Sequence, residues 1–351
     1  MQKTITATTA SSDSGASPLS SRTIRDQRRV ASLSLDLDNL WSYLKIHGDS
    51  GWAARPSYYD TFVPYIVDFL AARQQKITFF IVGADAAEPA NGPALRRLVD
   101  AGHELGNHSL EHEPWLHRYT RAQLEHEIRA TGDAIAQATG RPVDGFRGPG
   151  FSWCPQLLEV LAEQGYRYDA STLPTFLGPV ARAYYFWSAG LSKAEREERK
   201  ELFGRFADGL RPVKPYRWTL DNGRDLIELP VTTMPLFRTP FHFSYLAYLA
   251  RFSEPLMMAY LHTAITMCRL SGTEPSFLLH PLDVIGGDQV PELKFFPGMD
   301  LASAHKARLL NRVLDTLEQH FRLVPMGEHV DRIAAGYLAQ RHPGVRQPVE
   351  A

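Results

Sequence analysis

Short apolar stretches alternate with helix-like stretches along most of this 351-residue chain, and this alternation limits the fold more than any other feature. Residues 77–82 (ITFFIV) form a continuous apolar run that stops at Gly83, which is typical of a strand buried on both faces. Residues 31–37 (ASLSLDL) alternate apolar and polar side chains, as a strand does. Strands separated by helices are joined by crossovers, so we expect an α/β fold with parallel β/α units.

The helices between these strands are marked by start and stop residues. Thr120 and Gln123 form a capping-box pattern, and Gly140 ends the same helix. By the same criteria, we expect further helices over residues 58–73, 93–101, 155–164 and 302–320. Further strands are expected over residues 104–107, 166–168, 227–231, 276–279 and 322–324.

One ordered domain is expected over residues 30–335, between a disordered N-terminal tail at 1–29 and a C-terminal tail at 336–351. Two stretches interrupt the alternation of strands and helices. Residues 172–225 include the charged run KAEREERKELF, and residues 233–272 are unusually aromatic and apolar. We interpret both as insertions in one barrel-like domain.

Composition and charge exclude several classes of protein. With 38 Lys and Arg against 39 Asp and Glu, and no basic run, the chain has no feature of a nucleic-acid-binding protein. No apolar stretch reaches the roughly 18 residues of a membrane span. Residues 1–29 lack the apolar core of a secretory signal, and the two cysteines form no disulfide pattern. We therefore expect a cytoplasmic protein.

Asp36 and Asp38 stand at the end of the first expected strand. Positions two apart on a strand face the same side, so the two carboxylates would project together. A pair of solvated acids at a strand end explains the pattern equally well. Asp-x-Asp also occurs in glycosyltransferases that hold a nucleotide sugar through a metal ion, so the pair alone identifies no reaction.

His108 and His112 are four residues apart, which places both on one side of a helical turn, where they can share a metal ion. Neutral imidazole suits zinc and other first-row metals. Two surface histidines in a His-rich loop are the plainer alternative, since His103 and His117 are close by. Glu113 and His117 are interpreted as bystanders.

Arg147 lies in the segment FRGPG at residues 146–150, directly after an expected strand. An arginine beside a rigid Gly-Pro turn can hold a fixed cation next to a carboxylate. Taken alone, the segment is also consistent with an ordinary turn at a strand end.

Together, four segments resemble the polysaccharide deacetylases, the NodB-homology enzymes of carbohydrate esterase family 4. They are Asp36-x-Asp38, GHELGNHS at 102–109 running into His112, FRGPG at 146–150, and LLHP at 278–281. Their order and approximate spacing match the family over about residues 30–333. The resemblance implies a distorted (β/α) barrel with two insertions and with its site at the carboxyl ends of the strands.

The resemblance also implies a metal site made by Asp38, His108 and His112. Zinc is the first choice for the ion, and Co²⁺, Fe²⁺, Mn²⁺ and Ni²⁺ are alternatives. Three protein ligands leave positions open for water and substrate, as a catalytic site requires.

The catalytic residues implied by the resemblance are Asp36 as general base, Arg147 as the residue that orients it, and His280 as general acid. The first motif departs from the family's commonest form, because Leu37 separates the two aspartates. No Asp-x-x-x-Trp motif is present, and Asp169 is expected to take its place.

We therefore expect a metal-dependent deacetylase that removes an N-acyl group, foremost N-acetyl, from an amino sugar on the cytosolic side. The sugar would be lipid-linked or nucleotide-linked. The aromatic stretch at 241–270 either covers the core or makes peripheral contact with the inner face of a membrane. A deformylase, an amidohydrolase acting on a non-polymer amide, a glycosyltransferase and a non-catalytic sugar-binding relative remain as alternatives.

Overall fold

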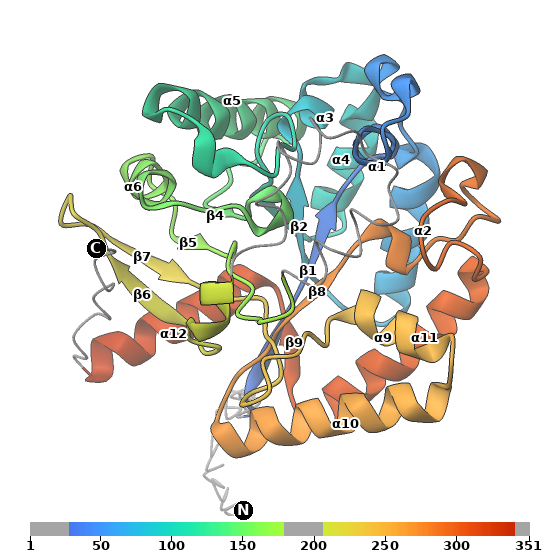
Figure 1. Ribbon diagram of the computed structural model, residues 1–351. Helices are drawn as coiled ribbons and strands as arrows, with labels where there is room; N and C mark the ends of the chain where they lie inside the picture. Colours follow the sequence, from blue (N-terminus) through green and yellow to red (C-terminus); the bar gives the residue numbers. More distant parts are fainter. Residues whose placement is uncertain (1–27, 179–205, 341–351) are drawn as a thin grey trace, which may run out of the picture.

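A computed structural model describes residues 28–178 and 206–340 (Figure 1). The expected N-terminal tail lies almost wholly outside the described residues, as does the charged run at 193–203. The expected boundary at residue 335 falls inside a helix that continues to Gln340.

A single sheet of nine strands forms the centre of the molecule, in the order β6-β7-β5-β4-β3-β2-β1-β8, with β9 also paired to β1. All described strand pairs are parallel except β6 with β7. The strands are β1 (Val30–Leu37), β2 (Thr78–Ile81), β3 (Glu104–Asn107), β4 (Gly145–Phe146), β5 (Tyr168–Asp169), β6 (Tyr216–Thr219), β7 (Asp225–Glu228), β8 (Ser276–Leu279) and β9 (Arg322–Val324).

Helices surround this sheet (Figure 1). They are α1 (Leu40–His47), α2 (Tyr59–Ala72), α3 (Gly83–Ala87), α4 (Gly92–Asp100), α5 (Arg121–Thr139), α6 (Pro155–Glu163), α9 (Phe243–Ala250), α10 (Glu254–Ser271), α11 (Ser303–Glu318) and α12 (Met326–Gln340). Short 3₁₀ turns are η1 (Ser50–Ala54), η2 (Pro89–Asn91), η3 (Leu116–Arg118), η4 (Pro149–Phe151), η5 (Phe206–Leu210), η6 (Pro281–Asp283) and η7 (Pro291–Leu293).

Local sequence signals explain where these elements begin and end. The capping box expected at Thr120 and Gln123 is confirmed, and Gly140 ends α5 in the left-handed conformation. Every residue of β1 is buried, including the polar Ser32 and Ser34, because β1 pairs with neighbouring strands and packs against α12. Ser32 meets this burial with a 3.1 Å contact from its Oγ to His329 Nδ1.

The sheet curls toward a closed barrel. Beyond β7, the Thr232 amide donates to the Ser276 carbonyl at 3.0 Å, and the Ser276 amide donates to Thr232 Oγ1 at 2.7 Å. These bonds connect the chain after β7 to the start of β8. The expected fold class, a distorted (β/α) barrel, is confirmed.

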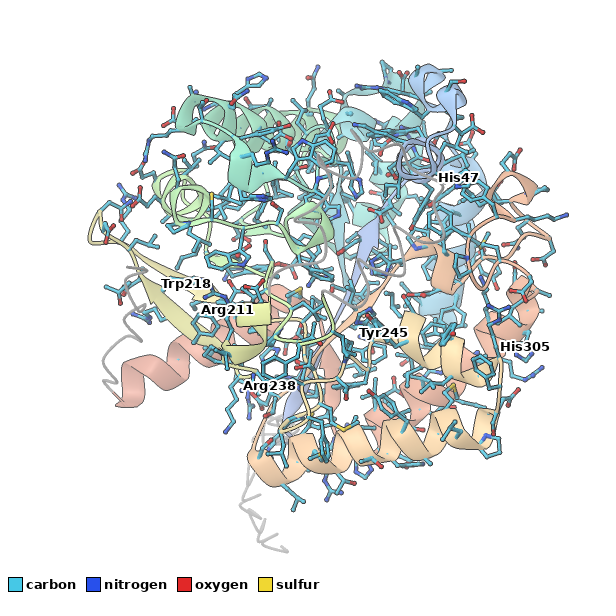
Figure 2. The ribbon with its side chains drawn as sticks, viewed as in Figure 1. His47, Arg211, Trp218, Arg238, Tyr245 and His305 are labelled. Atoms are coloured by element: carbon cyan, nitrogen blue, oxygen red, sulfur yellow. The ribbon has the colours of Figure 1, made fainter. Side chains whose placement is uncertain are left out.

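The two expected insertions contain regular structure where they are described. In the first, β6 extends the sheet, and its Trp218 lies 5.4 Å from the Arg211 guanidinium, ring centroid to Cζ (Figure 2). The second contains α9 and α10, whose inner faces join the main core. Within the described ranges, no helix combines the length and apolarity needed to cross a membrane.

Candidate active site

The ends of neighbouring strands bring the polar motif residues together. After β1 ends at Leu37, the Asp38 amide donates back to the Asp36 carbonyl at 2.9 Å, and this tight turn keeps both aspartates at the strand end. His108 follows β3, which lies two strands from β1 in the sheet. Parallel strands end at the same edge of a sheet, so residues far apart in sequence meet there.

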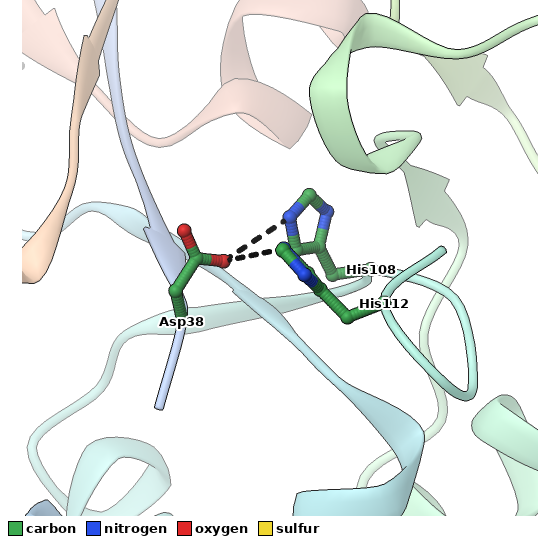
Figure 3. Close-up of side chains that lie close together, drawn as sticks. All are labelled: Asp38, His108 and His112. Atoms are coloured by element: carbon green, nitrogen blue, oxygen red, sulfur yellow. Dashed lines mark ion pairs between the residues drawn. The ribbon is translucent and has the colours of Figure 1, made fainter. Parts of the chain in front are cut away.

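Asp38, His108 and His112 form a compact group of three buried side chains (Figure 3). Asp38 Oδ1 lies 3.0 Å from His112 Nε2 and 3.5 Å from His108 Nε2. One ligand atom from each of the three lies within 4.8 Å of the others. Two imidazole nitrogens and one carboxylate oxygen at this spacing form a donor set suited to a catalytic zinc-like ion.

The hydrogen bonding of this group fits a divalent cation. His108 Nδ1 lies 2.7 Å from the Arg147 carbonyl oxygen. A carbonyl oxygen only accepts, so Nδ1 carries the ring proton and the lone pair of Nε2 faces Asp38. Asp38 Oδ1 is buried, and no described group makes a hydrogen bond to it with acceptable geometry. A buried carboxylate oxygen without a donor is costly, and a cation would satisfy it.

Burial and charge shift the pKa values of these groups in consistent directions. Burial alone would raise the pKa of Asp38, but the charge of His112 and contacts with both histidines hold it well below its usual value. Burial alone would lower the pKa of His108, and the charge of Asp36 and contact with Asp38 raise it instead. The site therefore stabilises positive charge next to an ionised Asp38.

The loop that carries His108 and His112 differs from the helical turn expected from their spacing, and that expectation is wrong. Ser109 and His112 have φ values of +63° and +54°, in the left-handed region that most side chains avoid. The loop is held instead by Glu127 of α5, whose Oε1 accepts from the Leu110 amide at 2.9 Å and the Glu111 amide at 3.2 Å.

The two residues interpreted as bystanders make contacts outside the triad. Glu113 Oε1 lies 2.6 Å from Lys45 Nζ. His117 Nδ1 lies 3.2 Å from Ser152 Oγ. Neither residue belongs to the group of potential metal ligands among the described residues.

Arg147 is fully buried and contacts Asp36. Its Nη1 donates to Asp36 Oδ1 at 3.1 Å, and its Nε donates to the Ala170 carbonyl at 3.1 Å. The guanidinium carbon also lies 4.7 Å from the centre of the Phe80 ring. These contacts fix the position of the Arg147 guanidinium, which bonds to Asp36 Oδ1 and not to Oδ2. Arg147 can therefore orient the Asp36 carboxylate, the role that the sequence led us to expect.

His280 follows β8 and lies across from Asp36, with 4.0 Å between His280 Nε2 and Asp36 Oδ2. Asp283, which the sequence analysis did not single out, accepts from the His280 amide at 2.8 Å and lies 3.7 Å from Nδ1. Burial lowers the pKa of His280, but Asp283, Asp36 and Asp38 outweigh burial and raise it to about 9. The three acids therefore favour the protonated form of the imidazole.

Asp169 lies outside the group formed by the other expected site residues. Its Oδ1 accepts from Ser171 Oγ at 2.5 Å, and Ser171 Oγ accepts from the Gly148 amide at 2.8 Å. Its neighbour on β7 is the buried Glu228, and burial raises the pKa of both acids. Asp169 thus contacts the FRGPG turn through Ser171, and among the described residues it makes no hydrogen bond to Asp36 or to the metal triad.

Part of this chain is similar in sequence to a known protein family. Residues 48–168 match the sequence model of the polysaccharide deacetylase family, a range that includes His108, His112 and Arg147. A chitooligosaccharide deacetylase from Sinorhizobium fredii is 33% identical over 132 residues, or 35% of this chain and 60% of the relative. A peptidoglycan deacetylase from Helicobacter pylori is 28% identical over 130 residues, or 36% of this chain and 44% of the relative.

Both matches therefore span less than two thirds of the relative's length. A solved structure from Mycobacterium smegmatis, assigned to the polysaccharide deacetylases, is similar over 93% of this chain and 96% of its own, with a TM-score of 0.57 and 17% identity. At that identity, the likeness shows the fold.

Proposed function

We propose that the chain is a metal-dependent hydrolase of the polysaccharide deacetylase superfamily that removes an N-acetyl group from an amino sugar, and its match to the family's sequence model and to a chitooligosaccharide deacetylase supports this. The observation that carries this proposal is the buried Asp38, His108 and His112 group beside the Arg147–Asp36 pair. The names of its relatives, chitooligosaccharide and peptidoglycan deacetylases, support the substrate class. The direct test is release of free amine from N-acetylglucosamine oligomers by protein of known metal content.

In the proposed mechanism, Asp38, His108 and His112 would hold a divalent ion. When bound, such an ion supplies positive charge that polarises the acyl carbonyl and makes water more acidic. His108 keeps its Nε2 lone pair directed inward through its bond to the Arg147 carbonyl. All three side chains are buried, which shields the ligand atoms themselves from bulk solvent.

Asp36 and His280 carry the two proton transfers. Asp36, oriented by Arg147, takes a proton from the water that adds to the acyl carbon. As the C–N bond breaks, His280 gives a proton to the leaving nitrogen, and the products are a carboxylic acid and a free amine. The distance of 4.0 Å between His280 Nε2 and Asp36 Oδ2 supports an acid and a base that act on the same acyl group.

We expect kcat to fall on the alkaline side with an apparent pKa no higher than about 9, the value to which His280 is raised. His280 must be protonated to act, and a raised pKa keeps it so until the pH passes that value. Asp38 contributes to the shift, so a cation that neutralises Asp38 would move the pKa below 9. In His280→Ala the alkaline limb should disappear and kcat should drop by about 10²–10⁴-fold.

The control is His305→Ala, because His305 lies on the outer helix α11, away from this site (Figure 2). It should keep both kcat and the alkaline limb. A His280→Ala protein with the same alkaline limb as the wild type would assign the acid to another residue.

For the remainder of the substrate, we propose an amino sugar linked to a lipid and met at the cytosolic face of a membrane. Most of the aromatic stretch at 241–270 packs in the core, including Phe243 and Leu261. However, Tyr248, Phe252 and Leu256 expose 50%, 72% and 52% of their surface. These three residues come after the first turn of α9 in the sequence, and in that turn Ser244 Oγ lies 3.4 Å from His280 Nδ1. A lipid chain that extends from the site along α9 could therefore reach them.

We expect kcat/KM to be more than tenfold higher for a lipid-linked N-acetyl sugar than for its water-soluble counterpart. Each buried methylene contributes about 0.8 kcal/mol, so a few methylenes suffice. Phe252→Ser combined with Leu256→Ser should remove this preference and lower co-sedimentation with lipid vesicles. Leu270→Ser, at the other exposed end of α10, is the matched control.

Equal kcat/KM for both substrates, with no vesicle binding, would contradict the lipid linkage. A nucleotide-linked sugar would then become the first candidate to assay.

A further inference from the structure

The short helix α3 (Gly83–Ala87) lies between the two chain segments that carry the metal-ligand candidates. Its first amide groups, which a helix leaves without partners inside itself, bond to the histidine loop. The Gly83 amide donates to the Ser109 carbonyl at 2.8 Å, and the Ala84 amide donates to the Leu110 carbonyl at 2.9 Å. The start of α3 therefore holds the backbone between His108 and His112.

The third residue of α3, Asp85, holds the other segment. Its side chain is only 3% exposed. Asp85 Oδ1 accepts from Asn39 Nδ2 at 2.7 Å and from Trp41 Nε1 at 2.8 Å. Asn39 directly follows Asp38, so Asp85 fixes the chain on the carboxyl side of that ligand.

Two side chains, Asn39 and Tyr59, make four further contacts with this segment. Asn39 Oδ1 accepts from the Leu40 amide at 2.8 Å and from the Tyr58 amide at 3.1 Å. The Tyr59 hydroxyl lies 2.7 Å from the Leu37 carbonyl and 3.2 Å from Asp85 Oδ2. The backbone on both sides of Asp38 is thus tied to Asp85 directly or through one side chain.

Close packing fixes where α3 lies. A Cβ atom at Gly83 would come within 2.6 Å of Thr131 Oγ1 and 2.8 Å of Leu110 Cδ1. The helix is therefore pressed between α5 and the histidine loop, on a side where only glycine fits. Movement of α3 would disturb both ligand-bearing segments together.

We propose that Asp85 is a positioning residue, through which α3 holds Asp38 and the His108–His112 loop at ligand distance before a metal ion binds. This inference rests on the proposed metal site and concerns no group that itself touches the ion. Asp85 acts through Asn39, Trp41 and Tyr59, which is the arrangement expected of residues that orient metal ligands from outside.

The test is Asp85→Asn, which keeps the size of the side chain but replaces one accepting oxygen with an N–H donor. Removing such outer partners typically weakens metal binding by about 10–100-fold. We expect the affinity of the metal-free protein for Co²⁺ to fall at least tenfold, within that range. The visible absorption spectrum of the cobalt protein should also change, because the ligand geometry changes.

Glu104→Gln is the matched control. Glu104 is also largely buried and accepts three bonds, from Thr78 Oγ1 at 2.7 Å, the Gly327 amide at 2.8 Å and Tyr168 Oη at 3.2 Å. It starts β3, at the opposite end from His108. This variant should lower the melting temperature of the protein but leave its cobalt affinity and spectrum unchanged.

Unchanged cobalt affinity in Asp85→Asn, or an equal loss in Glu104→Gln, would overturn the role of Asp85. If Asp85→Asn does not fold, Tyr59→Phe is the deciding variant, because it removes both contacts of the Tyr59 hydroxyl, to Asp85 Oδ2 and to the Leu37 carbonyl. Its cobalt affinity should fall in the same direction, and an unchanged affinity would overturn the proposal. Wild-type protein that binds no cobalt would instead contradict the proposed function itself.

Discussion

Replacing Asp36 with asparagine is expected to lower kcat by about 10²–10⁴-fold, the range typical of a general base, while the metal stays bound. Asp36 Oδ1 accepts from Arg147, and its other oxygen faces His280, so the carboxylate lies beside the triad and not within it. Asparagine keeps the size of the side chain but cannot take a proton from water. The measurement is kcat on an N-acetylglucosamine oligomer together with metal content per chain.

The pattern in the two quantities distinguishes the roles of the neighbouring acids. If Asp36→Asn lost the metal as well as turnover, Asp36 would be a metal ligand. Asp38 would then be the candidate for the general base. Normal turnover in Asp36→Asn would show that another group accepts the proton.

Asp38→Asn is expected to lose both bound metal and activity, the latter by at least about 10³-fold. Stabilisation of charge by a catalytic metal is worth several kcal/mol, and each 1.36 kcal/mol corresponds to about tenfold in rate. The neutral amide removes the negative charge that lies between His108 and His112. Metal content after gel filtration and the rate of amine release measure the two effects.

Glu111→Gln is the control for this loss. Glu111 lies in the histidine loop, but its partly exposed side chain pairs with Arg55 at 2.7 Å instead of facing the triad. The control should retain metal and activity. An Asp38→Asn protein with full metal occupancy would remove Asp38 from the set of ligands.

Much of the fold could be predicted from the sequence, because the apolar periods are strong and the helix ends are marked. The run at 77–82 became β2, and the Thr120 capping box starts α5. The same patterns placed Asp36, Asp38, His108 and His280 at strand ends, where the curled sheet gathers them. Because the strands are parallel, residues that follow different strands lie close together at one edge of the sheet.

The conformation of the histidine loop could not be predicted in the same way. A spacing of four residues fits a helical turn, but Ser109 and His112 adopt left-handed backbone conformations. Such conformations are stabilised by tertiary contacts, here the bonds from the loop amides to Glu127. Nothing in the local sequence of the loop specifies a partner on α5.

The sequence analysis did not identify the buried acids outside the motifs, for a related reason. Asp85, Glu127 and Glu228 each stand alone in an otherwise ordinary helix or strand pattern. The only local sign of each is one acidic residue at a position that faces the core. Its role can be assigned only when the residues that it contacts in the folded structure are known. Asp169 was expected to act in the site, and in the structure it lies beside Glu228 and bonds to Ser171.

The proposed function is tested most directly by measuring amine release from N-acetylglucosamine oligomers before and after removal of bound metal, on protein whose metal content is determined in parallel. We expect about one zinc-like ion per chain at Asp38, His108 and His112, as the single group of three donors among the described residues indicates. Release should stop in the chelated protein and return with added zinc or cobalt. Full amine release by metal-free protein would contradict the proposed metal-dependent deacetylation.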